Sequence, residues 1–190
     1  MKDIREKFCL YGNILDVGCG IGNFVECLDG KYFGVDFSYD SVREHRGKHR
    51  KPVAVGDAQN LPFKEKVFSF VNAVEVAQYM ENHRIFIKEI SRVMKNDGIA
   101  IVISPNPDSI FWIVRQKIRG KSPLNFVKLT EIIEYAKNSS LEVVYIDGIF
   151  PIPFWKIFDR FFQIFIPKFL KVYFVVFFSK SFVMVFRKKS

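Results

Sequence analysis

Short apolar runs alternate with amphipathic stretches along most of this chain. The runs are bounded by glycine, proline, aspartate or asparagine, which is typical of short buried strands. The stretches between them repeat apolar residues at helical spacing. Strands are predicted at residues 14–17, 31–36, 53–56, 67–73, 98–104, 141–147 and 181–186, and helices at 22–29, 39–47, 82–94, 109–118 and 130–138, the last capped by Thr130. Because strands and helices alternate, the sequence predicts a parallel sheet with right-handed crossovers.

The first predicted strand ends in an acidic residue followed by three alternating glycines, Asp16-Val17-Gly18-Cys19-Gly20-Ile21-Gly22. Glycine tolerates positive φ and lets a ligand approach the backbone closely, so we expect this turn to cradle a nucleotide. A helix directly after the turn would offer its free amide groups to the ligand. The spacing differs from the G-x-G-x-x-G of dinucleotide-binding proteins.

Three later segments support a nucleotide site. Residues 31–36 read as a second strand ending in Asp36, at the position where a carboxylate meets ribose hydroxyls in a doubly wound sheet. The second segment is Gly56-Asp57-Ala58-Gln59-Asn60-Leu61-Pro62-Phe63, and the third is Arg92-Val93-Met94-Lys95-Asn96-Asp97-Gly98.

Together these motifs resemble the class I S-adenosylmethionine-dependent methyltransferases, and most closely their small-molecule, type 11-like family. The resemblance covers residues 10–104. It implies an α/β, three-layer Rossmann-like methyltransferase fold with a seven-stranded, mostly parallel sheet in the order 3-2-1-4-5-7-6 and an antiparallel last strand. We expect a single domain over residues 1–190, with a cofactor-binding half at 1–104 and a substrate-side half at 105–190. The chain departs from the family at Ser69, where an aspartate is usual.

The resemblance also implies the cofactor, S-adenosyl-L-methionine, whose product is S-adenosyl-L-homocysteine. Asp16 would compensate the positive charges of the methionine part, and Asp36 would bind the ribose. Phe37 would pack on one adenine face, while Asp57 and the backbone of Ala58 would contact the adenine edge. The predicted cofactor residues are Asp16, Gly18, Cys19, Gly20, Asn23, Asp36, Phe37, Asp57, Ala58 and Asn72.

Methyl transfer is an in-line displacement, so a catalytic base is optional and no metal is predicted. The candidates for a base are Glu75, Tyr79 and His83, which follow the fourth predicted strand. Many relatives show E-x-x-x-H after this strand, and here Tyr79 stands at the histidine position. For each of the three residues, a role as cap, packing or surface residue stays open.

The carboxyl-terminal third is rich in phenylalanine, of which the chain has 22. Residues 154–178 repeat apolar side chains at helical spacing, but Asp159, Arg160, Lys168 and Lys171 interrupt the run, and Pro167 breaks the helix. The segment is therefore predicted to be amphipathic and not to span a bilayer. Three interpretations stay open: core, the wall of an apolar substrate pocket, and a helix at the membrane surface.

The net charge and the motifs of the chain restrict the class of methyl acceptor that we expect. The net charge of +9 favours an acidic partner, but the D/N/S-P-P-aromatic motif of amino methyltransferases is missing at Asn72-Ala73-Val74-Glu75. We therefore expect a small-molecule or lipid-like methyl acceptor and not nucleic acid. RNA or protein methylation is the alternative, as is a non-catalytic scaffold that binds the cofactor. Three cysteines without disulfide-like spacing favour a cytoplasmic location, with peripheral contact at the inner membrane face left open.

Overall fold

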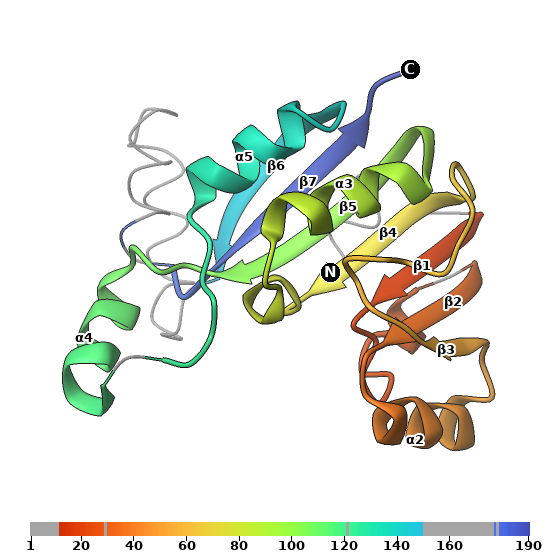
Figure 1. Ribbon diagram of the computed structural model, residues 1–190, viewed down its shortest axis with the longest axis horizontal. Helices are drawn as coiled ribbons and strands as arrows, with labels where there is room; N and C mark the ends of the chain where they lie inside the picture. Colours follow the sequence, from red (N-terminus) through yellow and green to blue (C-terminus); the bar gives the residue numbers. More distant parts are fainter. Residues whose placement is uncertain (1–11, 29, 121, 150–176, 178) are drawn as a thin grey trace.

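Seven strands form one sheet in the computed structural model, in the order β3-β2-β1-β4-β5-β7-β6 (Figure 1). The structure describes residues 12–28, 30–120, 122–149, 177 and 179–190. The strands are β1 (Asn13–Val17), β2 (Lys31–Asp36), β3 (Val53–Val55), β4 (Phe68–Val74), β5 (Met94–Pro105), β6 (Leu141–Ile149) and β7 (Ser181–Lys188). This order confirms the sheet that the sequence resemblance implies.

The parallel part of the sheet is built around β1. Its apolar residues are buried, and it pairs in parallel with β2 on one side and β4 on the other. In this register Asp16 lies beside Gly34 of β2 and beside Asn72 of β4. The carboxyl ends of β1 to β5 therefore meet at one edge of the sheet, where open α/β sheets bind ligands.

Strand β7 runs antiparallel between β5 and β6. Val185 pairs with Ile101 of β5 and with Tyr145 of β6. At the end of β7, the Lys188 Nζ donates hydrogen bonds to the carbonyl oxygens of Ser91 (2.7 Å) and Met94 (2.9 Å). These carbonyls lie at the end of a helix, so the ammonium group satisfies acceptors that the helix leaves free.

In the part of the chain that the structure describes, four helices and two single turns connect the strands. They are α2 (Tyr39–His49), α3 (His83–Val93), α4 (Ile110–Arg119), α5 (Leu129–Lys137) and the 3-10 turns η1 (Val25–Cys27) and η2 (Ala77–Tyr79). Side-chain oxygens of Ser38, Asn82 and Ser109 accept hydrogen bonds from the first turns of α2, α3 and α4. Each of these three helices therefore begins at a polar residue that satisfies an amide otherwise left free.

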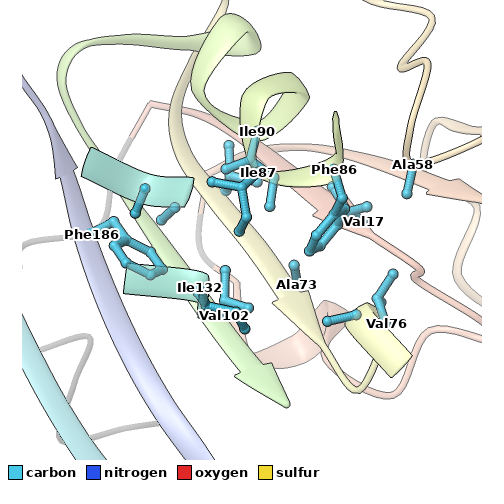
Figure 2. Packing of buried hydrophobic residues seen from close by; sticks show 14 of the residues in the cluster. Val17, Ala58, Ala73, Val76, Phe86, Ile87, Ile90, Val102, Ile132 and Phe186 are labelled. Carbon is cyan, nitrogen blue, oxygen red and sulfur yellow. The ribbon is translucent and has the colours of Figure 1, made fainter. Parts of the chain in front are cut away.

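The main core lies between the sheet and the two neighbouring helices α3 and α5 (Figures 1 and 2). Phe86, Ile87 and Ile90 of α3 point at the sheet, and Ile132 of α5 lies near Phe186 of β7 (Figure 2). All five side chains are buried, and each contributes about 1.5–3 kcal/mol by leaving water. A second cluster fills the opposite face of the sheet, with Ile14, Val25, Leu28, Tyr32, Phe70, Ile99, Ile101, Ile103, Val183 and Val185.

The prediction of a helix at residues 22–29 is wrong. The structure has only the turn η1 there, with hydrogen bonds of the i to i+3 type from Cys27 N to Phe24 O and from Leu28 N to Val25 O. Gly22 adopts a φ of 92°, which a right-handed helix excludes. Leu28 is already extended, at φ −114° and ψ 91°, so one turn is all that fits before β2.

Two element boundaries also differ from expectation. Strand β5 begins at Met94, four residues before the predicted start, because Met94 pairs with Phe68 and the ladder resumes at Ile99 after a bulge. Helix α5 begins at Leu129 and is not capped by Thr130. Instead the Glu131 carboxylate accepts a hydrogen bond of 2.9 Å from the Lys128 amide.

The predicted amphipathic helix in residues 154–178 lies outside the described residues, except for Phe177. Within the part of the chain that the structure describes, no helix has the length and apolarity that crossing a membrane requires.

Candidate functional site

A cavity of about 780 Å³ opens where β1 to β4 end. This volume is within the range of small-molecule sites, and the cavity lies at the ligand-binding edge of the sheet. The wall is formed by Val17, Gly18, Val35, Asp36, Phe37, Ser38, Ser41, Gly56, Asp57, Ala58, Gln59, Glu75, Val76, Tyr79, Met80 and Glu81.

The glycine turn is bound to the end of β2 by its own amides. The amides of Gly18 and Cys19 donate to Val35 O (2.7 and 3.1 Å), and the Gly20 amide donates to Asp36 Oδ2 (2.8 Å). A Cβ at Gly18 would overlap the Val76 side chain, so only glycine fits there. In this geometry the amides stabilise the turn itself, and the turn places Gly18 on the cavity wall.

Asp36 presents a fixed carboxylate to the cavity. Its Oδ2 accepts from the Gly20 amide, and its Oδ1 accepts from the Ser38 amide at 2.9 Å. A carboxylate oxygen can accept two hydrogen bonds, so each oxygen retains the capacity to accept one more from a ligand hydroxyl. The adjacent Phe37 ring is 82% exposed and lines the same cavity, which leaves it free to stack on a flat ligand.

Asp16 lies behind the cavity wall in a buried polar chain. Its Oδ1 accepts from Asn72 Nδ2 (2.7 Å) and its Oδ2 from the Tyr32 hydroxyl (3.1 Å). Burial raises the pKa of Asp16 to about 6, although both hydrogen bonds act to lower it. Tyr32 has one hydroxyl proton and donates it to Asp16, so His45 Nε2, 3.0 Å away, donates to the Tyr32 oxygen.

Two further predicted cofactor residues lie in the glycine turn but do not line the cavity. The pKa of Cys19 is raised to about 12, mainly by burial and to a smaller extent by the nearby Asp16 and Asp36 carboxylates. The thiol of Cys19 therefore stays neutral. Cys19 packs closely against the backbone at Gly34, where a Cβ would lie 2.9 Å from its sulfur. Asn23 is exposed, just before η1.

Asp57 and Ala58 belong to a loop that α3 holds in place. The Asp57 carboxylate accepts from the Gln59 amide at 2.8 Å, which fixes the tip of the loop. Farther along, Arg92 Nη1 donates to Phe63 O (2.8 Å), and its Nη2 donates to Leu61 O (3.0 Å).

The same arginine is paired with an acid on its own helix. Arg92 Nε donates to Glu89 Oε1 at 2.7 Å, and Arg92 Nη2 donates to Glu89 Oε2 at 2.8 Å. Glu89 Oε2 also accepts from the Leu61 amide, at 2.8 Å. Hydrogen bonding to Arg92 lowers the pKa of Glu89, against the opposing effect of burial. The Glu89–Arg92 pair thus binds both the amide and the carbonyls of the loop.

Of the three candidate bases, Glu75 and Tyr79 line the cavity and His83 does not. Glu75 adopts a φ of 56°, and its carboxylate accepts from Gln78 Nε2 (3.1 Å) and from the Ser181 hydroxyl (3.0 Å). Tyr79 is 66% exposed at the rim. His83 Nε2 lies 3.1 Å from Asn125 O, at the start of α3.

The sequence motifs did not indicate a role at the site for Ser181, Arg92 or Glu89. Ser181 is brought to Glu75 by the insertion of β7 beside β5, and no local motif signals it. Arg92 begins the segment that the resemblance used to place a turn and the following strand, and Glu89 lies three residues before it, on the same helix. In the described part of the chain, no cluster of histidine, cysteine, aspartate or glutamate could hold a metal ion.

Comparison with known families gives a match over residues 15–102, which run from β1 into β5, to a family model described as a methyltransferase domain. The strand order, the glycine turn and the cavity at the ends of β1 to β4 define the class, a class I methyltransferase fold. The chain carries a methyltransferase domain of this class.

Several curated proteins are similar to the chain over part of their length. An uncharacterized protein of Methanocaldococcus jannaschii is 32% identical over 75% of this chain and 55% of its own length. A fatty-acid O-methyltransferase of Mycolicibacterium smegmatis is 30% identical over 50% of the chain and 37% of its length. A 2-methyl-6-phytyl-1,4-hydroquinone methyltransferase of Synechocystis is 33% identical over 60% of the chain and 35% of its own length. The chain thus spans about half the length of the first of these relatives and about a third of the other two.

Solved structures share the fold at low identity. A SAM-dependent methyltransferase of Thermotoga maritima superposes with a TM-score of 0.72 at 21% identity, over 99% of this chain and 88% of that one. A second structure is geranyl diphosphate C-methyltransferase of Streptomyces coelicolor, crystallised with geranyl diphosphate and S-adenosyl-L-homocysteine. It superposes with a TM-score of 0.69 at 18% identity, over 93% of this chain and 73% of that one. These structures confirm the fold.

Proposed function

We propose that this chain binds S-adenosylmethionine at the carboxyl edge of its sheet and transfers the methyl group to a small-molecule or lipid-like acceptor. The observation that carries the proposal is the composition of the cavity wall. Asp36 and Phe37 follow β2 on one side, and Glu75 and Tyr79 follow β4 on the other. A cavity of about 780 Å³ with a fixed carboxylate and an exposed aromatic ring fits a nucleoside with a flat base.

The cofactor residues have distinct roles in this proposal. Asp36 accepts hydrogen bonds from the ribose hydroxyls, and Phe37 stacks on the adenine. Asp57 and the Ala58 backbone contact the adenine edge. Asp16 contributes negative charge from behind the glycine turn, because its two oxygens are already bonded to Asn72 and Tyr32.

The acceptor would lie beside Glu75. When bound, the cofactor supplies an electrophilic methyl group on a sulfonium. The chain holds the acceptor atom in line and excludes water, and both effects lower the barrier of such a displacement. Glu75 receives, on a carboxylate oxygen, the proton that a hydroxyl acceptor loses, and its hydrogen bonds from Ser181 and Gln78 fix the carboxylate in the cavity.

Calorimetry with S-adenosylhomocysteine tests cofactor binding. We expect saturable binding by the wild-type chain and an affinity loss of about tenfold or more in Asp36→Ala, because two hydrogen bonds to a charged group are removed. Asp40→Ala is the matched control, since Asp40 is an exposed aspartate of α2 paired only loosely with Arg43, at 3.8 Å. Absence of binding by the folded wild-type chain would reject the proposal and leave a scaffold role.

The acceptor class rests on two observations. The motif of amino methyltransferases is absent at the end of β4, and two similar proteins are named for a fatty-acid and a phytyl-quinol acceptor. The test is transfer of a radiolabelled methyl group from the cofactor into fractionated cell extract. We expect label in the small-molecule or organic-extractable fraction, and label chiefly in RNA, DNA or protein would contradict the acceptor class without affecting the cofactor site.

A further inference from the structure

Helix α4 has an apolar face that points outward. Ile110, Ile113, Val114 and Ile118 are 39%, 40%, 44% and 76% exposed. Their spacing of three and four residues places them on one face of the helix. Surface helices of globular domains normally bury such a face, so the exposed stripe of α4 requires an explanation.

The inner side of α4 is anchored by one residue. Trp112 is buried, its Nε1 donates to Lys180 O at 2.9 Å, and its ring centroid lies 4.8 Å from that of Phe126. The Arg115 guanidinium lies 4.9 Å from the centroid of the Trp112 indole. The apolar stripe is therefore not needed to attach the helix to the domain. Figure 1 shows α4 standing apart from α2, α3 and α5.

All charged side chains of α4 itself are basic, and the exposed Asp108 lies just before its N-cap Ser109. No aspartate or glutamate occurs between Asp108 and Glu131, and the basic residues of this stretch are Arg115, Lys117, Arg119, Lys121 and Lys128. Lys117 is exposed on the same face as the stripe, and Lys180 lies with its Nζ 6.0 Å from the Phe111 ring centroid. An apolar stripe flanked by cations is the pattern of helices that lie in the interface of an anionic membrane.

We propose that α4 docks the protein on an anionic lipid surface, with Ile110, Ile113, Val114 and Ile118 entering the acyl boundary and the basic residues contacting the headgroups. Lys117 lies on the same face, and its long stem lets the ammonium reach the headgroups while the isoleucines insert. This goes beyond methyl transfer, and it holds whether or not the acceptor is itself a lipid.

Co-sedimentation of the full chain with vesicles tests the docking surface. We expect binding to vesicles of phosphatidylcholine and phosphatidylglycerol, weaker binding to phosphatidylcholine alone, and a decrease with salt. Val114→Glu should weaken binding to anionic vesicles at least fivefold or so, since it replaces an inserted side chain by a like charge. Ile85→Glu is the matched control, because Ile85 of α3 has the same exposed fraction, 44%.

The other outcomes overturn the proposal. If the wild-type chain binds neither vesicle, α4 is not a membrane surface. If Val114→Glu binds as well as wild type, the contact lies elsewhere in the chain. If Val114→Glu instead changes the mass in solution, the stripe docks a second copy. Melting temperature and S-adenosylhomocysteine affinity, both expected to match wild type, separate these outcomes from misfolding and from failure of the proposed cofactor site.

Discussion

The Asp16 carboxylate lies buried between Asn72 and Tyr32, under the turn that forms part of the cavity wall. Burial opposes its ionised form more strongly than the two hydrogen bonds favour it, and its pKa is raised to about 6. The Tyr32 hydroxyl is also held neutral, because burial and the Asp16 charge raise its pKa. The charge state of one residue beneath the cavity therefore depends on pH near neutrality.

A raised pKa at Asp16 makes stability depend on pH in a defined direction. Between pH 3.8 and about 6 the folded state holds the proton of Asp16 more tightly than the unfolded state, so this group's contribution falls as pH rises. Above about pH 6 the ionised, buried Asp16 lowers the free energy of unfolding by its full amount, on the order of 3 kcal/mol. Asp16→Asn should remove this loss.

The measurement is urea unfolding of wild type and Asp16→Asn at several pH values. The free energy of unfolding of the variant, minus that of wild type, should increase as pH rises from about 4 to about 6. A constant difference over this range would show that folding does not raise the pKa of Asp16.

At the scale of elements, α3 does more than cover the sheet. Its Glu89–Arg92 pair binds Leu61 and Phe63, in the loop that brings Asp57 and Ala58 to the cavity. The pair is partly buried, with side chains 13% and 32% exposed. A guanidinium can bind a carboxylate and two carbonyls at once because its donors lie in a rigid plane.

Removing the Arg92 side chain should release this loop. We expect Arg92→Ala to lower the free energy of unfolding by about 2–3 kcal/mol and to weaken S-adenosylhomocysteine binding, because two loop carbonyls and the Glu89 carboxylate lose their donor. Arg92→Lys should recover only part of the loss. Urea unfolding and calorimetry measure the two effects.

The control for Arg92 is Arg43→Ala on α2. Arg43 is 73% exposed, and its contact with Asp40 is 3.8 Å long. Such a surface pair contributes about 0–1 kcal/mol. Equal effects of the two substitutions would mean that the loop contacts of Arg92 contribute nothing measurable.

At the scale of the whole molecule, the insertion of β7 joins the two halves of the chain at the cavity. Ser181, the first residue of β7, donates to Glu75, the first residue after β4, across 106 positions of sequence. Strand β7 is held on both sides, by β5 and β6, so the position of Ser181 is fixed by two ladders. Ser181 is therefore a positioning residue for Glu75.

Ser181→Ala should reduce turnover and leave cofactor affinity unchanged. The expected fall in kcat is about tenfold, smaller than the hundredfold or more expected for Glu75→Gln, because the carboxylate is kept and loses one of its two side-chain donors. Ser181→Thr retains the hydroxyl and should recover activity. Turnover is measured with the extract fraction that accepts label, and a parallel loss of S-adenosylhomocysteine affinity would indicate a structural role.

The alternation of strands and helices, the family of the domain and the acids near the ends of β1 and β2 could be predicted from the sequence. Apolar periodicity and glycine spacing are local, so they are visible without the fold. The sequence did not show that Gly22 prevents a helix after the turn, because a glycine's φ depends on where the chain must go next. It also did not show that Asp16 is bound by Asn72 and Tyr32.

Which side chains share the cavity depends on the fold and could not be predicted from the sequence. Glu75 and Tyr79 line it and His83 does not, although all three follow β4. The insertion of β7 brings Ser181 to Glu75, and the packing of α3 brings Arg92 to the loop that carries Asp57. Both contacts join residues far apart in the sequence. The outward apolar face of α4 was likewise undetectable, since helical periodicity shows that a helix has an apolar face but only packing shows which way that face points.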